Sequence, residues 1–182
     1  MKQAVPYLTR PDGTESDAYI YANYFIARKL TFLERIDLLK NVSEHYQTKL
    51  FTFNQTPFLP ECQNVGKVDY LNEMPQVFRH SKINLNITLR SIYSGIPLRA
   101  FDIMGSGGFL LSNYQEDFLD YFTPGEDFDY YDGVDDLLAK IDYYLSHEKE
   151  RRQIAENAAH KVLTEHTYEN RIQFMLKTAG LR

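Results

Sequence analysis

Two strand-length segments enclose one helix-length segment near the middle of the chain, and this order constrains the fold more than any other feature. The two outer segments cover 83–89 and 109–111, and the segment between them, 97–104, starts with a proline, which the first turn of a helix tolerates. A strand, a helix and a strand joined by short links predict a parallel strand pair with a crossover helix. Glycines at 105–108 follow this helix, so they predict a helix C-cap and a tight turn rather than a dinucleotide-binding loop.

The rest of the sequence extends the same alternation. We expect a long helix over 18–46, strands at 50–53, 65–70 and 128–131, a short helix at 72–79, and helices through the C-terminal third. The predicted buried face of the long helix contains Phe25, Phe32, Ile36 and Leu39. The predicted fold class is α/β, a three-layer Rossmann-like parallel sheet with helices on both faces. The expected organisation is an irregular lead-in (1–16), one domain (17–166) and a C-terminal helix (167–182).

Composition argues against several classes of function. The net charge is −5 and no basic stripe is present, which disfavours nucleic-acid binding. A single cysteine, Cys62, and five scattered histidines predict no disulfide framework and no zinc site, and we expect no cofactor. No transmembrane segment or secretory signal is predicted from the sequence, and the expected location is cytoplasmic.

The predicted strand at 83–89 alternates strictly between apolar and polar residues. Asn84, Asn86, Thr88 and Arg90 would share one side, whereas a buried parallel strand is apolar on both. One interpretation is a half-exposed or edge strand. The other is a polar wall beside a pocket, because ligands of open α/β sheets bind beyond the C-terminal ends of the strands.

The segment that follows this strand modestly favours a binding site. Gly95 permits close approach of a ligand to the backbone, and the helix N-terminus near 97 suits a diphosphate. Arg90 and Arg99 can add charge-assisted bonds to phosphate oxygens, and Asp102 can accept hydrogen bonds from two ribose hydroxyls. The competing interpretation is a surface ion pair between Arg99 and Asp102 at i,i+3, which spacing alone favours.

A second acidic pattern has two interpretations as well. Asp127-Phe128-Asp129 matches the Asp-any-Asp pattern of metal-dependent glycosyltransferases. Three residues match by chance often, so the favoured interpretation is a strand flanked by solvated acids.

The run SKINLNITLRSIYSGIPLRAFDIMGSGGFLLSN, at 81–113, resembles the donor-binding domain of group 1 glycosyltransferases, and most of all the branch related to the spore maturation protein CgeB. The similarity continues through 121–172 and covers roughly the last 120 residues. It implies one half of a GT-B fold from a longer bacterial enzyme, with a nucleotide-sugar as substrate and no metal. It also implies a separate N-terminal acceptor domain, reached by the last helix.

The family pattern is a Glu, seven residues and a second Glu. Asp102 takes the place of the second, which contacts the ribose, whereas the first falls at Ser94, which is not acidic. Gly95 and Ile96 match the loop that approaches the phosphates and the sugar, and Arg99 matches an arginine of the CgeB-like branch. The predicted donor-binding residues are Asn86, Arg90, Ser94, Gly95, Ile96, Arg99 and Asp102; no catalytic residue is assigned.

Two functions of different classes remain open. The leading one is a donor domain that transfers a sugar to a glycan or protein only together with its acceptor domain, and that self-associates through the apolar surface left without that domain. The other is a non-catalytic nucleotide- or sugar-binding or scaffold module on the same fold, which the non-acidic Ser94 favours. A receiver-like domain is disfavoured because 50–56 holds no acidic cluster.

Overall fold

A computed structural model describes residues 16–181 of the 182-residue chain. The chain divides into two compact units, which are described separately. The described part of the first contains residues 16–49 together with Thr56–Gln63 and Thr88–Tyr93. The second contains Leu50–Gln55, Asn64–Ile87 and the chain from Ser94 onward.

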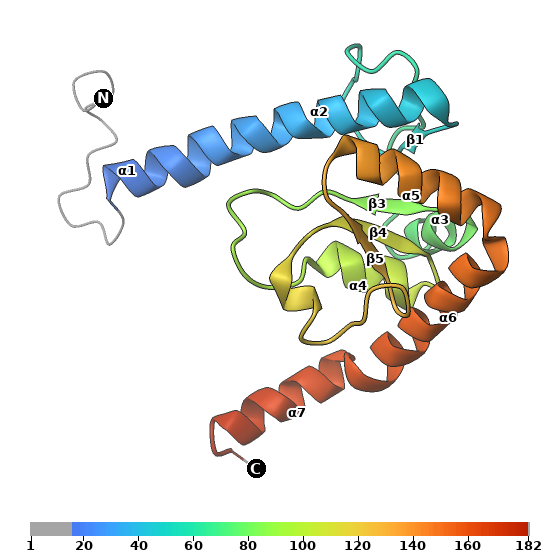
Figure 1. Cartoon of the computed structure of the whole chain (residues 1–182). Coiled ribbons are helices and arrows are strands. Elements are labelled where there is room, and N and C mark those ends of the chain that lie inside the picture. The colour runs from blue at the N-terminus through green and yellow to red at the C-terminus, as the bar shows by residue number, and fades with distance from the viewer. Residues whose placement is uncertain (1–15, 182) are drawn as a thin grey trace. The chain divides into compact units, whose positions relative to one another are not determined.

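The second unit is built on a three-stranded parallel sheet (Figure 1). Its strands are β3 (Asn84–Asn86), β4 (Leu110–Asn113) and β5 (Asp129–Tyr131), in the spatial order β3-β4-β5. Leu85 pairs with Leu111, and Leu111 pairs in turn with Asp129. The parallel sheet predicted from the alternation of strands and helices is confirmed.

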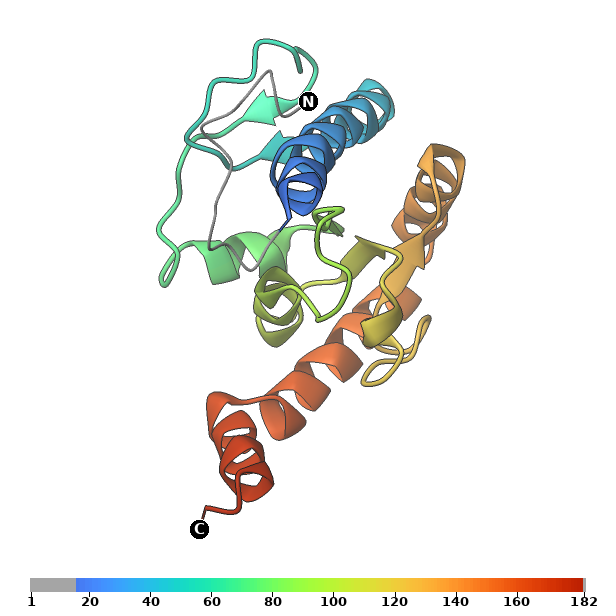
Figure 2. The same cartoon turned by 90° about the vertical axis from the view of Figure 1, so that its left-hand side faces the viewer.

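Helices cover both faces of this sheet. Leu110 lies in a buried core with Ala100 of α4 (Leu98–Gly105), whereas the neighbouring Phe109 ring lies 4.5 Å from that of Tyr144 on α5 (Val134–Ser146). Because successive residues of a strand point to opposite faces, α4 and α5 lie on different sides, as Figure 2 also shows. The other helices of this unit are α3 (Met74–His80), the 3-10 turn η3 (Glu116–Phe118), α6 (Glu148–Glu165) and α7 (Tyr168–Thr178).

The glycine-rich turn after α4 has the predicted capping geometry. Gly107 has a φ of 78° and donates its N–H to the carbonyl of Met104, while Gly108 N–H donates to the carbonyl of Ile103, each over 2.9 Å. This pair of bonds is a Schellman cap. A Cβ at Gly108 would lie 2.7 Å from Asn84 Nδ2 and 2.8 Å from Phe78 O, so the turn passes too close to its neighbours for any side chain.

The polar side of β3 faces inward, which neither sequence interpretation anticipated. Asn84 and Asn86 are both buried. The Asn84 amide donates to the carbonyl of Phe78 at 3.0 Å, and the Asn86 amide donates to Ser112 Oγ on β4 at 2.9 Å. β3 is an edge strand of the three-stranded sheet, as one interpretation predicted. Its asparagines nevertheless stabilise the interior through hydrogen bonds to the Phe78 carbonyl and to the next strand.

A continuous helical run begins at Asp17 in the described part of the first unit (Figure 1). It contains α1 (Asp17–Ile20), the π-helical segment η2 (Tyr21–Ile26) and α2 (Ala27–His45), and it confirms the long helix predicted at 18–46. The predicted buried face was wrong, because Phe25 and Phe32 are 52% and 44% exposed. The buried face instead contains Ile20, Asn23, Ala27, Thr31, Leu38 and Val42.

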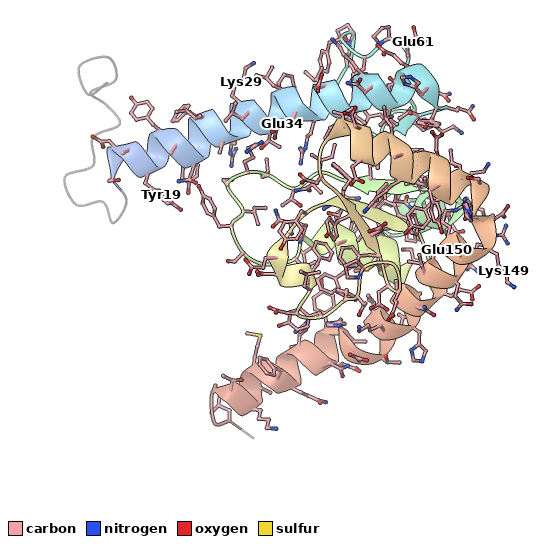
Figure 3. All side chains as sticks on the ribbon, viewed as in Figure 1. Tyr19, Lys29, Glu34, Glu61, Lys149 and Glu150 are labelled. Atoms are coloured by element: carbon pink, nitrogen blue, oxygen red, sulfur yellow. The ribbon has the colours of Figure 1, made fainter. Side chains whose placement is uncertain are left out.

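Hydrogen bonds within the first unit explain why this face carries polar residues. The Arg90 N–H donates to Thr31 Oγ1 and the Tyr93 hydroxyl donates to Asn23 Oδ1, each at 3.0 Å. Arg90 also pairs with Glu34, which Figure 3 labels on the same helix. A purely apolar face would leave the backbone and side chains of the segment Thr88–Tyr93 without these partners.

The two strands predicted before α3 differ from expectation. Only β1 (Lys49–Leu50) and β2 (Gln63–Asn64) form there, and they pair with each other. The predicted strand at 65–70 is wrong, because Gly66 has a φ of 92° and the Asp69 carboxylate accepts the N–H groups of residues 71 and 72 in a turn. The predicted lead-in at 1–16 lies outside the described residues, apart from its last position.

Candidate functional site

A loop with a left-handed glycine precedes α4 at the C-terminal edge of the sheet. Gly95 has a φ of 89°, a conformation that favours glycine, and no described atom lies within 4 Å of the position of a Cβ. Pro97 is the N-cap of α4, and its side chain makes no capping hydrogen bond. The loop therefore combines an accessible backbone with a helix N-terminus whose first N–H groups lack a side-chain cap.

A cavity of about 250 Å³ opens beside this loop. The segments that follow β3 and β4 both contribute to its wall, together with α4 and α7. In a parallel sheet the C-terminal ends of the strands share one edge, which is where open α/β sheets bind ligands. The lining residues are Gly95, Ile96, Phe101, Asp117, Tyr121 and Arg171.

Two predicted residues, Gly95 and Ile96, line this cavity, but the other four lining residues, Phe101, Asp117, Tyr121 and Arg171, were missed. Asp117 accepts a hydrogen bond from the Gly95 N–H. The Arg171 guanidinium stacks on the Tyr121 ring, 5.1 Å from its centroid. Asp117 lies in η3, the first element after β4, so the rule about strand ends could have indicated it, whereas no signal in the sequence points to Arg171.

Asp102, the predicted ribose ligand, is bonded to a tyrosine of the same unit. The Tyr70 hydroxyl lies 2.9 Å from each oxygen of the Asp102 carboxylate, and this hydrogen bond raises the pKa of Tyr70. The predicted ion pair between Arg99 and Asp102 does not form. Arg99 is exposed, with its guanidinium 5.5 Å from the centre of the Phe78 ring.

The remaining predicted residues lie in different surroundings. Asn86 is buried against Ser112 within the sheet, and it is absent from the cavity wall. Ser94 is exposed next to Gly95. Arg90 belongs to the first unit, where its guanidinium bonds the Glu34 carboxylate through both Nε and Nη2.

The two acids of the Asp-any-Asp pattern stand in separate networks. Asp127 pairs with Lys161 at 2.9 Å, whereas Asp129 pairs with Lys140 at 3.1 Å and accepts the Tyr144 hydroxyl at 2.8 Å. The expected strand flanked by solvated acids is wrong, because Asp127 precedes β5, Asp129 is its first residue, and both acids are buried. Among residues 16–181, no three His, Cys, Asp or Glu side chains gather in a way that could hold a metal ion.

Comparison with models of protein families shows which family the chain belongs to. The glycosyl transferase-like family matches residues 28–177, which include the whole sheet, the glycine loop and the cavity. The chain belongs to this glycosyl transferase-like family. No curated protein matches the sequence. None of the described helices combines the length and the apolar character that crossing a membrane requires.

One solved structure, that of HepE, supports the fold of this glycosyl transferase-like domain. HepE of Anabaena, crystallised in complex with UDP-glucose, matches with a TM-score of 0.60 at 12% identity, over 80% of this chain and 44% of HepE. The C-terminal domain of LpcC, a group 1 glycosyl transferase family protein of Francisella tularensis, matches with a TM-score of 0.49 at 21% identity, over 59% of this chain and 55% of LpcC. The chain thus spans about half the length of these structures. The likeness to HepE confirms the α/β fold expected for one half of a GT-B enzyme.

Proposed function

We propose that this chain is the donor-binding domain of a glycosyltransferase, and that it holds a nucleotide-diphosphate sugar for transfer to a glycan or protein acceptor. One observation carries the proposal. In a chain of the glycosyl transferase-like family, the accessible Gly95–Ile96 backbone and a cavity lie together where β3 and β4 end. The UDP-glucose bound to HepE makes this sugar-nucleotide the first donor to test.

The diphosphate would bind at Gly95 and at the N-terminus of α4, whose partial positive charge favours an anion. Arg99, exposed in the first turn of α4, would add a charge-assisted hydrogen bond. The same groups would stabilise the nucleoside diphosphate as it departs, so that no metal ion is needed for this purpose. Asp102 would accept the ribose hydroxyls, because a carboxylate that already accepts one hydroxyl has acceptor positions left.

Transfer would need a second domain, which binds the acceptor. The chain spans 44% of HepE, and we propose that it has no transferase activity by itself. The surface of α7 is consistent with such a partner, because Tyr168, Phe174 and Met175 are 83%, 65% and 66% exposed. Without a partner, this apolar surface would promote self-association. The CgeB-like branch, the bacterial source and the cytoplasmic location stay predictions.

A titration followed by calorimetry tests donor binding. UDP-glucose, UDP, GDP, CDP and dTDP are added in turn to the 182-residue chain and to the variants Asp102→Asn and Glu156→Gln. Asp102→Asn should weaken binding of the preferred nucleotide about tenfold to a hundredfold, because it removes the charge from two hydrogen bonds to the ribose. Glu156, an exposed carboxylate on α6, is the matched control and should leave the affinity unchanged.

The alternative function is a non-catalytic binding or scaffold module. Ser94 favours it, because the family pattern has an acid at this position and Ser94 is exposed beside the cavity loop. Nucleotide binding that is equal in the wild type and in Asp102→Asn would support this alternative. A longer protein that contains this domain, binds the nucleotide-sugar and neither hydrolyses nor transfers the sugar would support it further.

A further inference from the structure

The backbone N–H of Gly95, where we expect a phosphate to bind, already donates a hydrogen bond to a carboxylate of the protein itself. Asp117, in the 3-10 turn η3 after β4, accepts the N–H of Gly95 through Oδ2. Both residues line the same cavity. A backbone N–H that holds a carboxylate oxygen is suited to a phosphate oxygen as well, since both are anionic acceptors of charge-assisted hydrogen bonds.

Among the described residues that line this cavity, Arg171 of α7 is the only one with a cationic side chain. Its guanidinium packs over the Tyr121 ring, and its Nη2 donates to His166 Nδ1 at 2.5 Å. Burial, reinforced by the charge of Arg171, lowers the pKa of His166, so the imidazole is neutral and can accept this bond.

The guanidinium of Arg171 shares the cavity with the Asp117 carboxylate but is not ion-paired with it. Within the described chain, no carboxylate forms an ion pair with its guanidinium. The neutral His166 orients the guanidinium without cancelling its charge, and the Tyr121 ring fixes its plane. Arg171 can therefore offer its remaining N–H groups to an anion in the cavity.

We propose that Asp117 holds the place of a donor phosphate, and that the diphosphate displaces it from Gly95 and pairs with Arg171. This inference rests on the proposed donor binding and assigns two residues of the site. In only a fraction of the molecules is the Gly95 N–H free of Asp117 and able to bind an anion. The apparent affinity falls to that fraction of the intrinsic affinity. The carboxylate also repels the incoming phosphates. Asp117 thus lowers the affinity of the pocket for anions, and Arg171 raises it.

The test measures binding of UDP and of inorganic pyrophosphate to the full chain, by calorimetry and by the amide NMR signal of Gly95. Asp117→Asn keeps an acceptor for the N–H but removes the charge, and it should tighten binding of both ligands about tenfold. Arg171→Gln should weaken both about tenfold, and Arg171→Lys should lie between it and the wild type. Glu116→Gln and Lys177→Gln remove the same charges from neighbouring exposed positions and should change neither affinity.

The outcomes separate this inference from the proposed function. Pyrophosphate that shifts the Gly95 signal and binds Asp117→Asn more tightly supports the displacement of Asp117 by a phosphate, even if no nucleotide binds and the donor function fails. Nucleotide binding that is the same in the wild type, Asp117→Asn and Arg171→Gln overturns the inference and leaves the donor function standing. Equal gains from Asp117→Asn and Glu116→Gln also overturn it, because the effect would then be one of overall charge. Failure of pyrophosphate to bind either the wild type or Asp117→Asn overturns it as well.

Discussion

Replacing Gly108 by alanine should destabilise the protein strongly, although the change adds only one methyl group. The new Cβ would lie 2.7 Å from Asn84 Nδ2, 2.8 Å from Phe78 O and 3.1 Å from Ile103 O. Two of these atoms are backbone oxygens, which cannot move aside cheaply. Overpacking of this kind costs about 1–3 kcal/mol, and the displaced Asn84 amide would lose its bond to Phe78, worth about 1 kcal/mol. The expected loss in the free energy of unfolding is about 2–4 kcal/mol.

Chemical denaturation followed by circular dichroism measures this loss, and a thermal scan should show Tm lower by about 5–12 °C. Gly105→Ala is the matched control in the same turn. Its Cβ would meet only Val162 Cγ1, at 3.3 Å, and Gly105 is in the last turn of α4, where alanine is the better helix former. This control should change the stability by less than about 1 kcal/mol. Equal stability of Gly108→Ala and the wild type would refute the close approach of the turn to Asn84.

Three other perturbations test separate parts of the structure. Tyr144→Phe removes a hydroxyl that donates to the buried Asp129 carboxylate, and it should lower the free energy of unfolding by about 2 kcal/mol in urea denaturation. His166 has a lowered pKa, so its contribution to stability is complete above about pH 6.5 and is lost as the pH falls below that value. Denaturation at several pH values should show this decline in the wild type but not in His166→Gln. Phe174→Ser, on the exposed face of α7, should reduce self-association in sedimentation velocity.

Each of these predictions has a result that would contradict it. A Tyr144→Phe protein as stable as the wild type would mean that Asp129 is satisfied by Lys140 alone. If the pH dependence of stability persists in His166→Gln but disappears in the exposed control His160→Gln, its assignment to His166 is contradicted. A wild-type chain that stays monomeric at high concentration would contradict self-association through the Phe174 surface of α7.

The elements from 72 onward were predictable because local signals agree with the tertiary contacts. Pro97 and the glycines at 105–108 mark the two ends of α4, and the apolar run at 109–111 supplies the buried strand β4. The predicted strand at 65–70 failed because Gly66 and Asp69 favour a turn that the apolar pattern hides. Turn chemistry outweighed hydrophobic periodicity in this segment.

The buried faces were harder to predict than the elements. Asn84 and Thr31 are buried because each bonds a group distant in sequence, the carbonyl of Phe109 or the N–H of Arg90. The amphipathic pattern predicts that polar residues are exposed. It therefore placed Phe32 in the interior and Thr31 on the surface, whereas the structure buries Thr31 and exposes Phe32. Polar residues that satisfy backbone groups of another segment cannot be recognised from their neighbours in sequence.

The candidate site was predictable where it is continuous in sequence. Gly95 and Ile96 line the cavity as expected from the loop before α4. Asp117 and Arg171 come from segments that approach the loop only in the folded chain. Their pairing with Gly95 and His166 depends on how η3 and α7 pack, which periodicity does not encode.

A crystal structure of the chain soaked with UDP-glucose tests the central claim most directly. Our account predicts the diphosphate within hydrogen-bonding distance of the Gly95 and Ile96 backbone, the ribose hydroxyls on Asp102, and the Asp117 carboxylate displaced from Gly95. Density for the nucleotide elsewhere on the protein, with Asp117 still bonded to Gly95 and Asp102 only to Tyr70, would contradict the assignment of this cavity as the donor site.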